Sequence, residues 1–334
     1  MDGVRIETVD PTDEAALRSW WEVTRAAADE RPYDLSPAWE TARRYYPLRD
    51  PAREVTLLGA RIGDGPLVGA AWVARPVGEN EHLLMLDLQV HPAARRRGVG
   101  GALVAASEEI ARADARTTII VEVLAPPATQ APGESFARSQ GYAEASSEDI
   151  KICDLATTAD RLPGLAAHAA ERLSPYTLLW WSDPTPEEHL EGLCALYSRF
   201  HSEIPLGDLD LRAQAWTPQR LRGAEERRVA AGRAHLLVAG VAPDGRLVGY
   251  SDLNVADASP HRASIESTLV LPEHRGHRLG LAMKALLHQQ TRALFPAVEF
   301  IVTGNAGVNT WMNAVNEQLG YGIVERCLDM QKVL

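Results

Sequence analysis

The chain of 334 residues is long enough for about two domains, each with its own core, and its 46% hydrophobic and 24% charged residues are those of an ordinary water-soluble protein. Its net charge of −11 at pH 7 argues against nucleic acid as a partner and favours a cationic one. No apolar stretch approaches the roughly 18 residues that span a bilayer, and the N-terminus lacks the basic start and apolar core of a signal peptide, so we expect a cytoplasmic protein without a membrane partner.

The three cysteines, Cys153, Cys194 and Cys327, lie far apart in the sequence, and their number is odd. This spacing predicts neither a disulfide framework nor a zinc site. We expect three reduced thiols, as is usual in the cytoplasm, and no bound metal.

The first half of the chain begins with a helix and continues with a β-hairpin. Residues 10–14, Asp-Pro-Thr-Asp-Glu, are a helix-start signal with an early proline and early carboxylates, so a helix is predicted over Ala15–Ala28. Two β-rich runs joined by the turn residues of positions 63–65, Gly-Asp-Gly, predict the hairpin. The hairpin strands and the strand, helix and strand that follow are predicted over Val55–Ile62, Leu67–Ala74, Leu83–Val90, 99–110 and Thr118–Leu124.

The second half repeats this order of elements. A second helix start, at residues 183–187, is followed by the same strand order. Residues 65–100 match residues 245–280 at a constant offset of 180. A repeat of this length predicts two copies of one globular domain, and helices that alternate with strands around a mixed sheet place both copies in the α/β or α+β class.

The segment between the copies, residues 156–175, is rich in Ala, Arg and Leu and is predicted to be a partly helical connector. We therefore predict an N-terminal domain over residues 1–160, a connector over 161–174 and a C-terminal domain over 175–334.

Each copy ends its third strand in an Arg/Gly-rich loop that leads into a helix. The first loop reads Arg-Arg-Arg-Gly-Val-Gly-Gly over residues 95–101. Glycines let a backbone approach a phosphate closely, the N–H groups at a helix start are unpaired, and arginines add charge-assisted hydrogen bonds. The loop is therefore predicted to bind a pyrophosphate. A dinucleotide fingerprint would need a glycine in place of Leu103, and a nucleoside-triphosphate loop would need Gly-Lys-Ser/Thr, which is absent.

The second loop, Arg-Gly-His-Arg-Leu-Gly-Leu over residues 275–281, has Arg278 where the first loop has Gly98. The arginine side chain either swings outward and leaves the backbone cradle open, or it fills the phosphate site. A basic helix cap without a ligand is therefore a stronger alternative for this loop than for the first. His274 and His277, which arginines flank, are predicted to be surface groups rather than metal ligands.

With Val90-His91-Pro92 before the first loop and the helix and Gly-aromatic turn of residues 136–142 after it, each half of the chain resembles the Gcn5-related N-acetyltransferase (GNAT) superfamily. The acetyl-CoA loop of that family reads Arg or Gln, two residues, Gly, any residue, then Gly or Ala. The resemblance implies two tandem domains, each with a central mixed, mostly antiparallel sheet flanked by helices, and acetyl-CoA as cosubstrate. The positions that it implies for acetyl-CoA binding are Leu88, Val90, Arg95, Arg96, Arg97, Gly98, Val99, Gly100 and Gly101 in the first half, and Val270, Arg275, Gly276, Gly280 and Asn309 in the second.

The reaction of this family is attack of a neutral amine on the thioester, with the carbonyl oxygen held by a backbone N–H of the strand before the loop. An alkylamine is protonated at neutral pH, so a carboxylate or water must take its proton. The candidates in the first half are Asp87, with Glu81 and His82 as further possibilities, and the candidate in the second half is Glu266, which aligns with Leu86.

The family commonly has a tyrosine as general acid four residues before the glycine of the Gly-aromatic turn, but Ala137 and Asn316 stand at these positions. Another donor or solvent serves, or the half in question does not catalyse. We thus predict an acetyl-CoA-dependent N-acetyltransferase that acts on a primary amine of a small molecule, as a monomer or homodimer, and the acidic charge favours a cationic acceptor. The alternatives are a non-catalytic or half-degenerate CoA-binding or interaction protein, and a transferase for protein lysines or N-termini.

Overall fold

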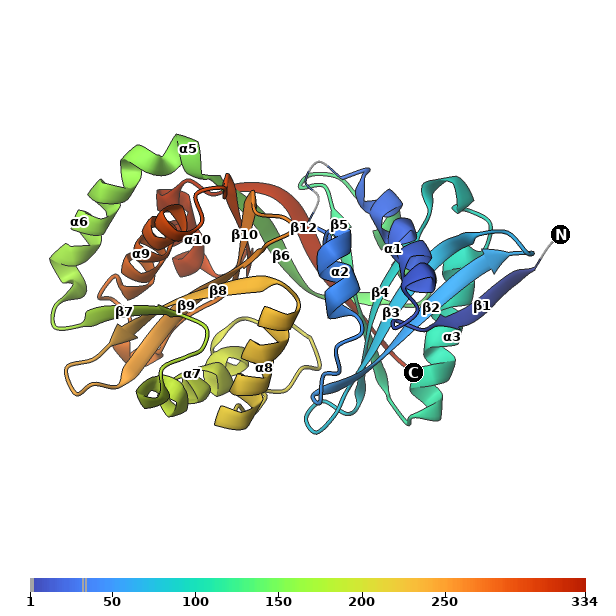
Figure 1. Ribbon diagram of the computed structural model, residues 1–334, viewed down its shortest axis with the longest axis horizontal. Helices are drawn as coiled ribbons and strands as arrows, with labels where there is room; N and C mark the ends of the chain where they lie inside the picture. The colour runs from blue at the N-terminus through green and yellow to red at the C-terminus, as the bar shows by residue number, and fades with distance from the viewer. Residues whose placement is uncertain (1–2, 32, 34) are drawn as a thin grey trace. The chain divides into compact units, whose positions relative to one another are not determined.

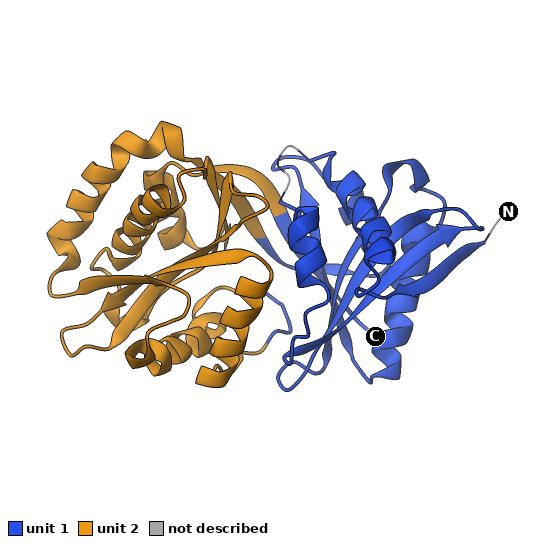
Figure 2. Cartoon of the chain, in the orientation of Figure 1, with its two compact units in different colours: residues 1–147, 207–211, 327–334 blue, residues 148–206, 212–326 orange. Residues whose placement is uncertain are grey.

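The computed structural model describes residues 3–31, 33 and 35–334, which fold into two compact units (Figure 2). Unit 1 consists of residues 1–147, 207–211 and 327–334, and unit 2 of residues 148–206 and 212–326. Among the helices of the described residues, none has the length and apolarity that crossing a membrane requires.

Unit 1 is a mixed sheet covered by helices on both faces (Figure 1). Its first four strands are antiparallel neighbours, and the fifth pairs with the fourth in parallel. The strands in sheet order are β1 (Val4–Val9), β2 (Arg53–Ile62), β3 (Leu67–Pro76), β4 (Leu83–Val90), β5 (Thr118–Ala125) and the end of β12 (Gly322–Val333). The helices are α1 (Glu14–Ala28), α2 (Trp39–Tyr45), α3 (Val99–Ala113) and α4 (Pro132–Ser139).

Unit 2 repeats this architecture. The strands in sheet order are the end of β6 (Ala143–Asp154), then β11 (Phe300–Ala306), β10 (Arg262–Val270), β9 (Leu247–Ala256), β8 (Arg233–Val241) and β7 (Thr177–Ser182). The helices are α5 (Leu155–Thr158), α6 (Leu162–Leu173), α7 (Leu190–Glu203), α8 (Pro218–Ala230), α9 (Leu279–Leu294) and α10 (Thr310–Leu319). The predicted class, two domains each with a mixed, mostly antiparallel sheet flanked by helices, is confirmed.

The helices divide the apolar residues of each sheet between two cores. In unit 1, Leu84 and Leu86 pack with Leu103 of α3, and Leu57 on the opposite face packs with Trp20 of α1. This separation follows from the alternation of side chains along a strand. It leaves the odd-numbered residues of β4, including Asp87, on the face away from α3.

Each unit completes its sheet with a strand from the other half of the sequence. The residues from Cys327 onward belong to unit 1, where Leu334 N donates to Thr117 O at 2.9 Å, and those from Glu148 to Asp154 pair with β11 in unit 2. The predicted boundaries at residues 160 and 175 place both strands in the domain of their own half. An alternating strand pattern does not say which of two similar sheets the strand joins, so sequence order alone could not reveal this exchange.

The predicted connector, residues 161–174, forms α6, and this helix lies within unit 2. Its buried residues Leu162 and Ala169 join the core that includes Leu281 and Ala282 of α9. The connector is therefore a packed helix of one unit.

The parallel strand pairs separate just before the two loops. Among the described residues, β4 pairs with β5 only from Leu83 to Leu86, and β10 pairs with β11 only from Arg262 to Ser264. Both β4 and β10 then continue for several residues beside an open edge, which ends at the Arg/Gly-rich loop.

Candidate functional site

The first loop presents a row of unpaired backbone N–H groups at the start of α3. Gly98 caps the helix with φ +83°, and Arg96 also has a left-handed φ of +62°. The first hydrogen bond of the helix runs from Ala102 N to Gly98 O at 3.0 Å, and the amides of residues 96–101 have no acceptor among the described residues. A Cβ atom added at Gly98 or Gly101 would meet nothing within 4 Å, so these amides face open space at the positive end of a helix.

Two arginine side chains beside these amides could also bind an anion. Arg96 and Arg97 are exposed, and neither has a hydrogen-bond or ion-pair partner within the described part of the chain. Arg95, in contrast, lies 2.6 Å from Glu30 through Nη1 and donates from Nε to the carbonyl of Val90 at 3.3 Å. The loop therefore combines a backbone cradle with two unpaired cations, which suits a phosphate group.

The other positions predicted to bind acetyl-CoA in the first half have packing roles or lie along β4. Val99 is buried, and a Cβ atom at Gly100 would come within 3.0 Å of the Phe136 ring, so Gly100 allows α3 to approach α4. Leu88 and Val90 are half-buried on the open edge of β4.

The second loop has the same backbone form. Gly276 has φ +86°, and Arg278, the cap of α9, has φ +57°. Ala282 N donates to Arg278 O at 2.9 Å, as in the first loop. Gly280 has only Val270 near its absent Cβ, at 4.0 Å.

The cationic side chains of the second loop are engaged within unit 2. Arg278 donates from Nη1 to the Glu171 carboxylate at 2.8 Å and to the backbone carbonyl of His168, both on α6. Arg275 lies 3.3 Å from the Glu203 carboxylate at the end of α7. The Arg275 contact matches that of Arg95 with Glu30 in the first loop, whereas the contacts of Arg278 engage a cation whose position is Gly98 in the first loop.

The two histidines of this loop lie at the surface but are half-buried, because the Tyr176 ring packs against them. The Tyr176 hydroxyl and His274 Nδ1 are 2.9 Å apart, and the ring centroids of Tyr176 and His277 are 4.9 Å apart. Within the described residues, no cluster of His, Cys, Asp and Glu could hold a metal ion. Asn309, a predicted acetyl-CoA ligand, caps α10 by accepting from Met312 N at 3.2 Å.

Asp87 lies on β4 directly after the last residue that pairs with β5, opposite Trp72 of β3. Solvent reaches its carboxylate, which accepts a hydrogen bond from Gln89 Nε2. Protein atoms packed around Asp87 partly desolvate its exposed carboxylate and raise its pKa above 3.8, against the lowering effects of Gln89 and of the nearby charge of Arg31. A carboxylate with a raised pKa beside an open strand edge is suited to accept a proton.

Glu81 and His82, the other candidates in the first half, are committed elsewhere. Glu81 accepts from Gly78 N at 3.0 Å in the turn before β4, and His82 Nε2 lies 2.9 Å from the carbonyl oxygen of Asp210. The first contact belongs to a local turn, and the second joins the start of β4 to the segment of residues 207–211 in unit 1.

Glu266 is the extra residue of a β-bulge in β10. Ile265 pairs with Leu253 and Ser267 with Asp252, so Glu266 has no partner on β9. In unit 1, Leu86 and Asp87 pair with consecutive residues of β3. The structural counterpart of Leu86 is therefore Ile265, and the gapless alignment of Leu86 with Glu266 was wrong because one residue is inserted here.

The bulge directs the Glu266 side chain toward solvent, as bulges commonly re-aim a side chain. Desolvation by the surrounding protein raises its pKa above 4.5, although a hydrogen bond with Asn254 lowers it. Glu266 thus shares with Asp87 an accessible carboxylate and a raised pKa, but it stands one residue before the position of Asp87, which Ser267 occupies.

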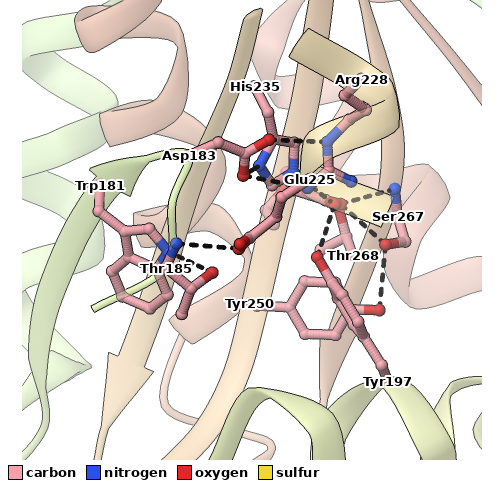
Figure 3. Close-up of polar contacts among 12 residues, drawn as sticks. Trp181, Asp183, Thr185, Tyr197, Glu225, Arg228, His235, Tyr250, Ser267 and Thr268 are labelled. Carbon is pink, nitrogen blue, oxygen red and sulfur yellow. Dashed lines mark hydrogen bonds and ion pairs between the residues drawn. The ribbon is translucent and has the colours of Figure 1, made fainter. Parts of the chain in front are cut away.

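A buried network of polar side chains lies behind this bulge in unit 2 (Figure 3). Asp252 Oδ1 accepts from Ser267 N at 3.0 Å and from Ser267 Oγ at 2.8 Å, and its Oδ2 accepts from the Tyr197 hydroxyl at 3.1 Å. His235 Nε2 lies 3.1 Å from the same Oδ2. The Asp252 carboxylate therefore replaces the backbone acceptor that the bulge removes from Ser267 N.

The other ring nitrogen of His235 lies 2.9 Å from Asp183, whose carboxylate also accepts two hydrogen bonds from Arg228, at 2.8 and 3.0 Å. Burial alone would lower the pKa of His235, but the hydrogen bonds to Asp183 and Asp252 raise it above 6.5 and thus favour the protonated ring. Sequence analysis missed this network. Its signal was a histidine and an aspartate within hairpin strands that are rich in apolar residues.

The positions where the resemblance expects a tyrosine also differ between the units. Ala137 is buried and apolar, whereas Asn316 accepts a hydrogen bond from Lys284 Nζ at 2.6 Å. Lys284 is 1% exposed, and desolvation together with the charge of Lys151 lowers its pKa to about 7. Sequence analysis missed Lys284, whose signal was a single lysine on the apolar face of α9.

Comparisons with known proteins were made at the level of sequence and of structure. A family model described as "Acetyltransferase (GNAT) family" matches residues 16–142 and 191–319. A comparison with curated protein sequences finds no match.

Among solved structures, the chain is similar to a tandem GNAT protein from the clavulanic acid biosynthesis pathway, determined without AcCoA, with 28% identity and a TM-score of 0.82 over 99% of this chain and 98% of that one. It also resembles a GCN5-related N-acetyltransferase from Sphaerobacter thermophilus, with 16% identity and a TM-score of 0.66 over 99% and 95% of the two chains. A GCN5-related glucosamine N-acetyltransferase region of a fungal multi-domain protein has 15% identity and a TM-score of 0.67, over 99% of this chain and 38% of that one. The last two similarities concern the fold alone.

Proposed function

Because the chain belongs to the acetyltransferase (GNAT) family, we propose that it is an acetyl-CoA-dependent N-acetyltransferase that acetylates a primary amine of a small molecule. The observation that carries this proposal is the first loop. Its amides of residues 96–101 have no acceptor among the described residues, and Arg96 and Arg97 have no partner there either. The space beside Gly98 leaves room for a phosphate to approach the backbone.

In this proposal unit 1 holds acetyl-CoA. The pyrophosphate binds the loop amides together with Arg96 and Arg97, and the thioester lies along the open edge of β4. Beyond Leu86 this strand has no β5 neighbour, so its outward backbone groups are available to hold the thioester carbonyl oxygen.

The amine nitrogen attacks the thioester carbon, an N–C bond forms, the C–S bond breaks, and CoA leaves as the thiolate. The amine must be neutral to attack, and the nitrogen of the tetrahedral intermediate must then lose one proton to give the amide. Asp87, with its raised pKa and its place beside the open edge of β4, is the proposed proton acceptor. The position of the usual tyrosine is Ala137 in unit 1, so solvent is proposed to protonate the thiolate.

One observation supports a small-molecule acceptor, and a second concerns the acceptor's charge. The relative with 28% identity is described as a protein of the clavulanic acid biosynthesis pathway, which makes a small molecule. The net charge of −11 favours a cationic acceptor over an anionic one.

A half-degenerate protein is the second candidate, in which unit 2 no longer binds acetyl-CoA. The contacts of Arg278 with the Glu171 carboxylate and the carbonyl of His168 favour it, because they engage the cation that caps α9. If unit 2 does bind acetyl-CoA, Glu266 is its proposed proton acceptor.

Calorimetric titration of the full chain with acetyl-CoA tests the proposal, and a screen of small amines for release of the CoA thiol follows. We expect one bound acetyl-CoA per chain and thiol release that depends on the amine. Absence of binding would refute the proposal. Binding without thiol release from any amine class, including aminosugars and polyamines, would favour a non-catalytic CoA-binding protein.

A further inference from the structure

The first arginine of the first loop joins three parts of unit 1. Arg95 Nε donates to the carbonyl of Val90, the last residue of β4, at 3.3 Å. Its Nη1 lies 2.6 Å from Oε2 of Glu30, which follows the end of α1. The loop, the end of β4 and the end of α1 therefore meet at one guanidinium group.

Unit 2 contains the same arrangement. Arg275 Nε donates to the carbonyl of Val270 at 3.0 Å, and its Nη2 lies 3.3 Å from Oε2 of Glu203. The two helix starts, at residues 10 and 183, are offset by 173, and the same offset relates Glu30 to Glu203. The two units thus retain this pair, although the other cationic side chains of their loops have different partners.

Stability does not account for the pair in unit 1. The side chains of Arg95 and Glu30 are 42% and 50% exposed, and ion pairs that are so exposed contribute little to folding because water screens them and both side chains lose entropy. A role in connecting parts of the site is a better explanation.

The end of α1 lies on the side of the sheet that carries Asp87. Arg31 directly follows Glu30, and its positive charge is close enough to Asp87 to lower the pKa of that carboxyl group partly. Glu30 therefore connects the first loop to the end of α1. The next residue there, Arg31, lowers the pKa of Asp87, the proposed proton acceptor.

We propose that Glu30 and Arg95 are positioning residues that fix the end of α1 against the first loop, so that acetyl-CoA bound at the loop also orders residues 29–31 beside Asp87. This inference rests on the proposed function. Arg95 can serve both groups, because its remaining N–H donors are available to a phosphate while Nη1 stays with Glu30. Neither residue contacts the reacting atoms in this account.

Hydrogen exchange of the full chain with and without saturating acetyl-CoA tests the inference without knowledge of the acceptor. In the wild type, acetyl-CoA should slow exchange at the loop amides 96–101 and also at residues 29–31, by up to about fivefold at the latter. In Glu30→Gln the loop should still be slowed, and residues 29–31 should exchange as in the free protein. Glu203→Gln, the matched change in unit 2, should behave as the wild type at both segments.

The outcomes separate the inference from the proposed function. The positioning role is wrong, although the acetyl-CoA site stands, if acetyl-CoA slows exchange of the loop amides but not of residues 29–31. It is also wrong if acetyl-CoA slows exchange of residues 29–31 equally in the wild type and in Glu30→Gln. The same holds if Glu203→Gln loses the effect at residues 29–31 as fully as Glu30→Gln does. If acetyl-CoA leaves the loop of the wild type unchanged, the proposed site fails, and the inference fails with it.

Discussion

The loops before α3 and α9 place residues in the left-handed region at the same two positions, yet they put glycine at different ones. The first loop has Arg96 and Gly98 there, and the second has Gly276 and Arg278. The strand-to-helix geometry therefore sets the backbone form, and a single glycine is not needed at either point. A left-handed arginine costs about 1–2 kcal/mol, and in unit 2 the ion pair of Arg278 with Glu171 partly offsets that cost.

The sheet faces beside the proposed proton acceptors differ in a related way. In unit 1, Asp87 on β4 stands opposite Trp72 on β3, and in unit 2, Ser267 on β10 stands opposite Asp252 on β9. The carboxylate of this cross-strand pair therefore lies on β4 in unit 1 and on β9 in unit 2. Asp87 remains accessible to solvent, whereas Asp252 is 4% exposed and held by hydrogen bonds. Only the first arrangement leaves this carboxylate available for proton transfer.

The largest expected effect concerns turnover. Asp87→Asn should lower the rate of acetyl transfer by about 10²–10⁴, the usual range for loss of a general base, with little change in acetyl-CoA affinity. It should also remove the fall in rate at acidic pH, because the group whose protonation stops the reaction is gone. Initial rates of CoA thiol release, measured over a range of pH, test this prediction.

The matched change in unit 2 is Glu266→Gln, which should leave turnover close to that of the wild type. The reverse result, a large loss with Glu266→Gln and none with Asp87→Asn, would move the chemistry to unit 2. Partial losses of about twofold in each variant would mean that both units catalyse independently.

The next largest effect concerns stability. Asp183→Ala should destabilise unit 2 by about 3–5 kcal/mol, because it leaves the buried charges of Arg228 and His235 without their shared carboxylate. Asp10, the counterpart of Asp183 at the first helix start, is exposed, and within the described residues its carboxylate bonds to Thr12 alone, so Asp10→Ala should have a small effect. Hydrogen exchange of β8 amides, compared with those of β2, reports the two units separately.

The pH dependence of this deficit follows from the two pKa shifts. Burial would raise the pKa of Asp183, but hydrogen bonds from His235 and Arg228 lower it to about 2, so its contribution is present above 3.8 and is lost as pH falls through about 2. The raised pKa of His235 gives a contribution that is present below 6.5 and is lost as pH rises through the folded-state value. The deficit of Asp183→Ala should therefore be greatest between pH 3.8 and 6.5. A deficit that does not vary with pH would mean that packing, not charge, accounts for it.

A smaller effect should distinguish charge from shape at the first loop. Asp and Asn both tolerate the left-handed conformation of residue 98 and have nearly the same shape. Gly98→Asp should weaken acetyl-CoA binding by about 10- to 150-fold, which corresponds to the 1.5–3 kcal/mol of a hydrogen bond to a charged group. Gly98→Asn should stay within a few-fold of the wild type in calorimetric titration. Equal losses would show that the space beside Gly98, rather than its electrostatics, limits binding.

The sequence was sufficient to predict the duplicated fold, because helix starts, hairpin turns and the Arg/Gly loops are local signals that recur in both halves. It was also sufficient to locate Asp87 on the strand before the first loop. It could not reveal the insertion at Glu266. The turn between β9 and β10 is shorter than the turn between β3 and β4, and this difference compensates for the inserted residue, so the two halves align without a gap before the turn and after the bulge.

The contacts that distinguish the units depend on long-range packing. Glu171 and Arg278 are far apart in the sequence, as are Asp183 and Asp252, and only the folded chain brings each pair to one place. The exchange of final strands between the units is of the same kind. A periodic pattern predicts a strand but not its neighbour.

The smallest expected effect tests whether the contacts of Arg278 with α6 prevent the second loop from binding a phosphate. Arg278→Gly alone should not create a second acetyl-CoA site, because it removes a cation and leaves the Glu171 carboxylate unneutralised beside the loop. The double variant Arg278→Gly with Glu171→Gln also removes that negative charge, and its amides then resemble those of the first loop. Stability should change by no more than about 1 kcal/mol, since relief of left-handed strain offsets the loss of an exposed ion pair. Calorimetry of the double variant should show a second, weaker acetyl-CoA site per chain. A stoichiometry that remains at one would mean that the shape of unit 2, and not the charge of its loop, prevents binding.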